Sequence, residues 1–96
     1  MMSNTIRAFY NYSSFGNSIG ICHNEIYDEI EITIPDGEGI EPYETESGEI
    51  AYKVPCGLCF WLYELFMVRA DGEIWMDYID TDGKRHKRKC SYKKIS

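Results

Sequence analysis

Basic residues are missing from most of the first half of this 96-residue sequence. Not one Lys or Arg lies between Ala8 and Tyr52, whereas ten acids do. The basic residues gather near the other end of the chain, where seven of them fall within residues 84–94. A protein that binds nucleic acid directly needs a positive surface to neutralise phosphates. The acids and the formal net charge of −6 therefore argue against direct nucleic-acid binding.

Long apolar segments are also missing. The longest apolar block covers residues 58–68 and is interrupted by Glu64. A membrane span needs about 20 apolar residues, and a signal peptide needs a basic start followed by an apolar stretch. Neither pattern occurs, so we expect no membrane contact and a cytoplasmic location. The four cysteines are then expected to be reduced thiols rather than disulfides.

The length of the chain fits one small domain, which we expect to span residues 1–96. Aromatic residues make up 15% of the sequence, and eight of them are Tyr. These aromatic side chains are numerous for the small core that a chain of this length can form. Tyr side chains on a protein surface often take part in recognition. We therefore expect part of the aromatic surface to stay exposed.

Two Asp-Gly pairs, Asp71-Gly72 and Asp82-Gly83, divide the C-terminal half into three segments. Between apolar segments, Asp-Gly is typical of a two-residue type I′ hairpin turn, which needs positive φ at both central residues. The sequence thus predicts a mainly β fold, an antiparallel sheet with a C-terminal three-stranded meander whose strands lie near 58–70, 73–81 and 84–92. The alternative is an α+β fold with a helix at 57–69, because five apolar residues also follow a helical spacing: Leu58, Trp61, Leu62, Leu65 and Phe66.

Two-residue turns would fix the register of the meander. The first turn places Val68 opposite Trp75, and the second places Trp75 opposite Cys90, so Trp75 is predicted to lie in the core. The same register predicts two cross-strand ion pairs, Asp80 with Arg85 and Asp77 with Arg88. Upstream, residues 29–35 alternate as a strand does, with inward positions at Ile30, Ile32 and Ile34 and outward positions at Glu29, Glu31 and Thr33.

Cys56-Gly57-Leu58-Cys59 has the spacing of a metal knuckle. A zinc site would need a second pair of ligands, and the candidates are His86 and Cys90, with Cys22 and His23 as spares. Residues four apart on a strand lie about 13 Å from each other, too far for one ion without a bulge. We therefore expect no metal and no other cofactor. A small zinc-binding or structural domain built on Cys56, Cys59, His86 and Cys90 is the alternative to a binding function.

Enzymatic chemistry has little support in the sequence. A redox role for the Cys-x-x-Cys segment needs a helix start in a βαβ unit, and nothing downstream supplies the parallel strand. Cys22 and His23 are not a nucleophile–base pair, because neighbouring residues of a strand point to opposite faces. We expect that the protein is not an enzyme.

The acids of residues 25–49 have two interpretations. They form a solvated face that keeps a small domain soluble, or a carboxylate array that occupies the basic groove of a nucleic-acid-binding partner, to which charge steers it. Tyr27 and Tyr43 sit among these acids and are candidate anchors, since aromatic residues dominate interface hot spots. The predicted partner-binding residues are Tyr27, Asp28, Glu29, Glu31, Glu38, Glu41, Tyr43 and Glu44.

In its size, its net negative charge and its series of acidic residues over 25–49, the chain resembles the small acidic phage proteins that inhibit bacterial defence nucleases, anti-CRISPR proteins among them. The resemblance is one of class and includes no shared motif. It implies an inhibitor that binds a nuclease and blocks its nucleic-acid path, which some members do by mimicking DNA. The basic residues 84–94 depart from a purely acidic DNA mimic, so the mechanism of inhibition stays open.

Overall fold

The computed structural model describes residues 4–12, 16–20 and 26–95 and confirms a mainly β fold. Within these residues, no helix has the length and apolar character that crossing a membrane requires. The strands are β1 (Thr5–Asn11), β2 (Ser18–Gly20), β3 (Tyr27–Thr33), β4 (Tyr43–Glu44), β5 (Ile50–Val54), β6 (Gly57–Cys59), β7 (Phe66–Val68), β8 (Ile74–Ile79) and β9 (Arg85–Lys94), and a 3₁₀ turn, η1 (Leu62–Leu65), precedes β7.

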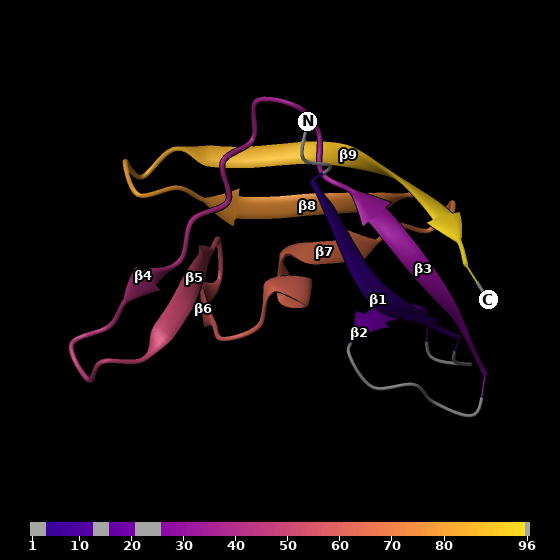
Figure 1. Ribbon diagram of the computed structural model, residues 1–96, viewed down its shortest axis with the longest axis horizontal. Helices are drawn as coiled ribbons and strands as arrows, with labels where there is room; N and C mark the ends of the chain where they lie inside the picture. The colour runs from indigo at the N-terminus through magenta and orange to yellow at the C-terminus, as the bar shows by residue number, and fades with distance from the viewer. Residues whose placement is uncertain (1–3, 13–15, 21–25, 96) are drawn as a thin grey trace.

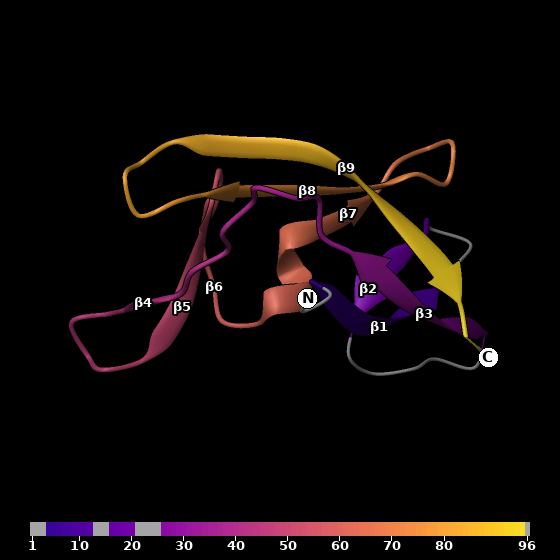
Figure 2. The same ribbon diagram turned by 45° about the horizontal axis from the view of Figure 1, so that its top comes forward.

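All strand pairs are antiparallel, and the main path across the sheet runs β2-β1-β3-β9-β8-β5-β4 (Figure 1). β6 lies beside β5, and β7 lies beside β8. The long strand β9 joins the two halves, because residues 85–90 pair with β8 and residues 91–94 pair with β3. Figure 2 shows how β9 bends between these two partners. The sheet therefore curls, and both β2 and β5 contact η1 inside the curve.

The core lies on the concave side of this sheet. As predicted, Ile30 and Ile32 of β3 point inward, and both are fully buried. β8 contributes Ile74, Met76 and Tyr78 to the same core, which fits the alternation of a strand with one covered face. The other core members are Ala8, Tyr10, Cys59, Leu65, Phe66 and Cys90.

The segment predicted as one strand over 58–70, or alternatively as a helix over 57–69, is neither. It divides into β6, η1 and β7, because the carboxylate of Glu64 accepts the backbone N–H groups of Phe60 and Trp61 at 3.1 and 3.2 Å and bends the chain there. Leu65 and Phe66 are buried by this turn. The other two strands of the meander lie close to their predicted positions, at 74–79 and 85–94 instead of 73–81 and 84–92.

The predicted register of the meander is wrong by one residue. Each Asp-Gly belongs to a three-residue loop, closed between Arg69 and Glu73 in the first hairpin and between Asp80 and Lys84 in the second. Only the glycines have positive φ, +85° at Gly72 and +84° at Gly83. Each loop is a type I turn followed by a left-handed glycine. Such a loop has the same Asp-Gly sequence as the expected type I′ turn, but it is one residue longer.

The shifted register moves Trp75 out of the core. Its neighbour Ile74 faces both Val68 and Cys90, in the place predicted for Trp75. Trp75 is half-buried on the other face of β8, where the Arg69 guanidinium lies 5.1 Å from the centre of the indole ring. The predicted pairs of Asp80 with Arg85 and of Asp77 with Arg88 do not form, and the observed partners are Arg85 for Asp77 and His86 for Asp80.

Candidate functional site

The acids of β3 lie beside the basic strand β9, and the two sets of charges pair within the molecule. Asp28 is 3.0 Å from the Lys94 ammonium, and Glu31 is 3.7 Å from that of Lys93. On the other side of β3, Glu29 lies 3.8 Å from a guanidinium nitrogen of Arg7. The acidic and basic halves of the sequence are thus brought into contact by the pairing of β3 with β9, and β3 offers a partner mostly neutralised charges.

Asp28 has a second partner, the hydroxyl of Tyr12. This hydrogen bond, followed by the contact with Lys94, lowers the pKa of Asp28. The same contact with Asp28 raises the pKa of Tyr12 to about 12. Asp28 therefore stays ionised in a local network that ties β1, β3 and β9 together.

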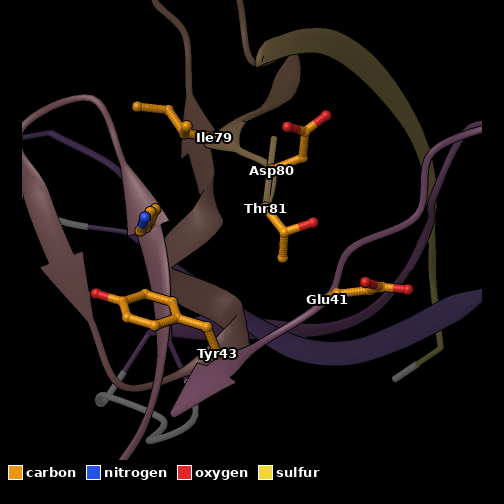
Figure 3. A pocket seen from close by; sticks show the side chains of 6 residues that line it. Glu41, Tyr43, Ile79, Asp80 and Thr81 are labelled. Carbon is orange, nitrogen blue, oxygen red and sulfur yellow. The ribbon is translucent and has the colours of Figure 1, made fainter. Parts of the chain in front are cut away.

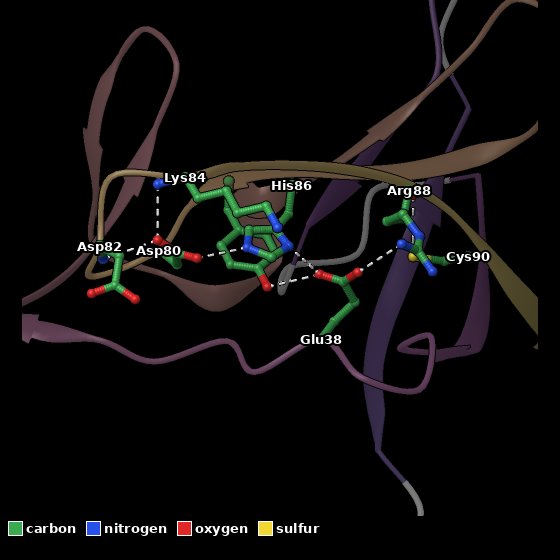
Figure 4. A network of polar contacts seen from close by, with 8 residues as sticks. Glu38, Asp80, Asp82, Lys84, His86, Arg88 and Cys90 are labelled. Atoms are coloured by element: carbon green, nitrogen blue, oxygen red, sulfur yellow. Dashed lines mark hydrogen bonds and ion pairs between the residues drawn. The ribbon is translucent and has the colours of Figure 1, made fainter.

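Glu38 lies on the connection between β3 and β4, and its side chain is only 4% exposed. Its carboxylate accepts a hydrogen bond from the Tyr78 hydroxyl at 3.0 Å and contacts Nδ1 of His86 at 2.5 Å and a guanidinium nitrogen of Arg88 at 3.1 Å. Figure 4 shows the Glu38 carboxylate pointing into the β8–β9 hairpin, with Asp80 at the far side of the imidazole. Glu38 thus fastens the β3–β4 connection to the sheet.

His86 is held between two carboxylates, since Nε2 lies 2.8 Å from Asp80 while Nδ1 faces Glu38. Its ring stacks on that of Tyr78, with 4.7 Å between the ring centres. The pKa of His86 is raised, first by the hydrogen bond with Asp80 and then by the negative charge of Glu38. The pKa of Tyr78 is raised as well, by burial and by its hydrogen bond with Glu38.

The raised pKa of His86 predicts a pH-dependent stability. Because the folded-state pKa lies above the ordinary value of 6.5, the stabilisation from protonated His86 is complete below that value and is lost as the pH rises through the folded-state pKa. We expect the melting temperature to fall as the pH is raised from about 6 to about 9, and the fall to be smaller in a His86→Gln variant. An NMR titration in which the His86 ring titrates below 6.5 would contradict this.

Four further acids of the first half lie on the hairpin formed by β4 and β5 or directly before it. Among residues 4–12, 16–20 and 26–95, no cationic side chain forms an ion pair with any of the four, which we call the acidic hairpin residues: Glu41, Glu44, Glu46 and Glu49. All four are exposed. Figure 1 shows this hairpin projecting from the sheet on the side away from β1 and β3.

The tip of this hairpin has the same three-residue loop as the two hairpins of the meander. The Thr45 N–H donates to the Glu49 carbonyl at 2.8 Å, and Gly48, at φ +85°, donates to the Thr45 carbonyl at 2.9 Å. The Thr45 hydroxyl oxygen also accepts the Glu49 N–H at 3.1 Å. These bonds fix the backbone on which Glu46 and Glu49 are carried.

Beside the hairpin lies a small hollow of about 110 Å³, shown in Figure 3. Its lining includes Glu41 and Tyr43 on one side and Asp80 and Thr81 on the other. The Lys53 ammonium lies 4.8 Å from the centre of the Tyr43 ring, so this half-buried tyrosine is partly covered by a cation. The hollow connects the acidic hairpin with the β8–β9 turn.

The eight predicted partner-binding residues thus fall into three groups. Tyr27, Asp28, Glu29 and Glu31 lie on β3, where the exposed Tyr27 packs edge-on against Phe9. Glu38 is buried in its own network, and Glu41, Tyr43 and Glu44 lie together at the hairpin. The sequence-based set omits Glu46 and Glu49, although the turn signal Ser47-Gly48 between them predicts their common position at a loop tip.

The thiols and the histidine do not gather into a metal site in the part of the chain that the structure describes. Cys56 is exposed, whereas Cys59 and Cys90 are buried in the core. Burial raises the pKa of Cys59, and it raises that of Cys90 to about 11, so both thiols stay protonated at neutral pH. The spare ligands Cys22 and His23 lie outside the described residues.

Among the described residues, the acidic hairpin gathers four exposed carboxylates that form no ion pair. Both ring nitrogens of His86 contact carboxylates of the chain itself. No protein-family model, curated protein or solved structure matches the chain.

Proposed function

We propose that the chain is a small protein-binding module that inhibits a nucleic-acid-binding protein, such as a bacterial defence nuclease, by placing its acidic hairpin in the basic groove of that protein. The observation that carries this proposal is the separation of the acids into two populations. Those of β3 and Glu38 are paired internally, while the acidic hairpin residues are exposed and have no ion-pair partner among the described residues.

Two physical arguments support this choice of surface. Unneutralised carboxylates on a projecting, hydrogen-bonded hairpin attract a basic groove over a distance, and a fixed backbone keeps the cost of ordering them low. The basic strand is the weaker candidate, since Arg85, Arg88, Lys89, Lys93 and Lys94 all form ion pairs with acids of the chain itself. Their pairing supports the expectation of no direct nucleic-acid binding.

The proposal predicts that charge removal at the hairpin slows association. In a variant carrying Gln at the four acidic hairpin residues, we expect inhibition of the target to be lost and the association rate at low salt to fall about tenfold or more. The matched control removes four charges elsewhere, with Asp28→Asn, Glu29→Gln, Glu31→Gln and Asp36→Asn. The measurement is a cleavage assay on a panel of purified defence nucleases, followed by surface plasmon resonance over a range of salt concentrations with the inhibited enzyme.

The salt series supplies a second criterion. The Debye length falls from about 30 Å at 0.01 M salt to about 8 Å at 0.15 M, so association of the unaltered chain should slow steeply over this range. The association rate of the hairpin variant should depend less on the salt concentration. Retained binding in the hairpin variant, together with lost binding when Lys84, Lys87, Lys93 and Lys94 are replaced by Gln, would contradict the proposal and make β9 the functional face.

A further inference from the structure

Three large apolar side chains are exposed where β6 leads into η1. Leu58, Phe60 and Trp61, which we call the apolar ledge, are 48%, 47% and 54% exposed. Leu58 lies on the outer side of β6, because its neighbour Cys59 points into the core, and Phe60 follows directly after the end of β6. Exposed Trp and Phe next to each other are unusual on a small domain and often mark a contact site.

The backbone of the apolar ledge is fixed by hydrogen bonds and by buried neighbouring side chains. The Glu64 carboxylate accepts the N–H groups of both Phe60 and Trp61, and the Glu64 N–H donates in turn to the Trp61 carbonyl at 3.0 Å. The buried side chains of Cys59 and Leu65 anchor the two ends of the segment. Trp61 also stacks on Tyr63, with 6.4 Å between the ring centres. An aromatic side chain on so fixed a backbone loses little entropy when it binds.

The apolar ledge adjoins the acidic hairpin. Leu58 lies opposite Lys53 across the β5–β6 pair, and it lines a surface hollow together with Tyr43, Thr45, Glu46 and Ser47. Glu46 of the acidic hairpin therefore borders the ledge at the Leu58 end. An apolar centre with a charged border is the usual anatomy of a protein–protein interface.

We propose that the apolar ledge is the anchor of the interface to which the acidic hairpin belongs, and that its occupant is a protein surface with an apolar cleft bordered by Lys and Arg. This inference rests on the proposed function and adds the apolar half of the partner's recognition surface. The charges select this occupant, because Glu46 at the border and the exposed Glu44 and Glu49 of the same hairpin complement a cationic rim.

A second copy of the chain fits the ledge less well. In a two-fold symmetric dimer the same patch meets itself, so the hairpin carboxylates of the two copies would approach one another. Like charges opposed across an interface are unfavourable. The occupant is therefore a different protein.

The test uses two synthetic probes, a helical amphipathic peptide of Lys and Leu and a second peptide in which Ser replaces every Leu. The sequence contains two Trp, so a Trp75→Phe chain leaves Trp61 as the only fluorescent indole. We expect the Lys/Leu peptide to bind more tightly than the Lys/Ser peptide and to shift the Trp61 emission to shorter wavelength. Trp61→Ala should weaken that binding about 30-fold, as at a typical hot spot.

Met67→Ala is the matched control, because Met67 is also a large exposed apolar residue but lies on β7, outside the ledge. It should leave the affinity unchanged, and melting curves should show that both variants fold. A Phe60→Ala variant provides a second test of the ledge with a different side chain.

The outcomes separate the two proposals. If both peptides bind with equal affinity and lose it when the hairpin acids are replaced by Gln, the proposal about the apolar ledge is wrong. The proposed role of the acidic hairpin would then still hold. Failure of both peptides to bind would overturn both proposals. A dimer in analytical ultracentrifugation that dissociates in the Trp61→Ala variant would show that the ledge takes a second copy of the chain, which would also overturn the inference.

Discussion

Replacing Glu38 by Ala should lower the free energy of unfolding by about 3–5 kcal/mol, the range found when one partner of a buried ion pair is removed. The side chain is almost fully buried and satisfies three groups at once, the Tyr78 hydroxyl, Nδ1 of His86 and the Arg88 guanidinium. Without the carboxylate, these donors lose their acceptor, and the β3–β4 connection loses its tie to the sheet. Urea denaturation at neutral pH measures the difference.

Glu41→Ala provides the control for Glu38→Ala. Glu41 lies three residues further along the same connection, is exposed and has no ion-pair partner among the described residues. Its replacement should change the free energy of unfolding by no more than about 0.5 kcal/mol, as is usual for surface positions. Equal effects at the two positions would show that the network around His86 does not hold the connection.

Met76→Ala should cost about 2–5 kcal/mol, whereas Trp75→Ala should cost less, about 1–2 kcal/mol, although Trp is the larger side chain. Met76 is fully buried in the core, and Trp75 is half-buried on the opposite face of β8. Under the register of a two-residue turn, the two residues would exchange faces and the order of the two costs would be reversed. Thermal or chemical denaturation of the two variants therefore measures the register directly.

The fold class and both hairpins of the meander could be predicted from the sequence, because alternating apolar residues and Asp-Gly pairs are local signals. The register could not. A type I′ turn and a type I turn followed by a left-handed glycine have the same preferred residues, yet they differ by one residue in loop length, and that residue decides which face of β8 is buried. The φ of the aspartate distinguishes the two turns, because it is positive in a type I′ turn, whereas no residue other than glycine has a positive φ among the described residues.

The candidate site was predictable only where it depends on local sequence. Glu41, Tyr43 and Glu44 are exposed or half-buried at a polar hairpin, as their surroundings in the sequence indicate. Glu31 and Glu38 look the same in the sequence, but their partners Lys93 and Arg88 lie far along the chain and approach through the pairing of β3 with β9 and the packing of the β3–β4 connection. The charge pattern of a sequence gives the sign of the net charge of a segment, but it does not identify the residues with which that segment forms ion pairs.

The position of β9 in the sheet affects folding during translation. β9 is the last of the described strands to leave the ribosome, yet it is the one that lies between β3 and β8. Until its residues 85–94 emerge, β3 has an open edge carrying Ile30 and Ile32, and no strand pairing among the described residues joins the β1–β3 half to the β8 half. Open edges of this kind pair readily with other chains. Folding during translation must therefore wait for the C-terminal strand, and nascent chains halted before it are the species that chaperones would have to protect.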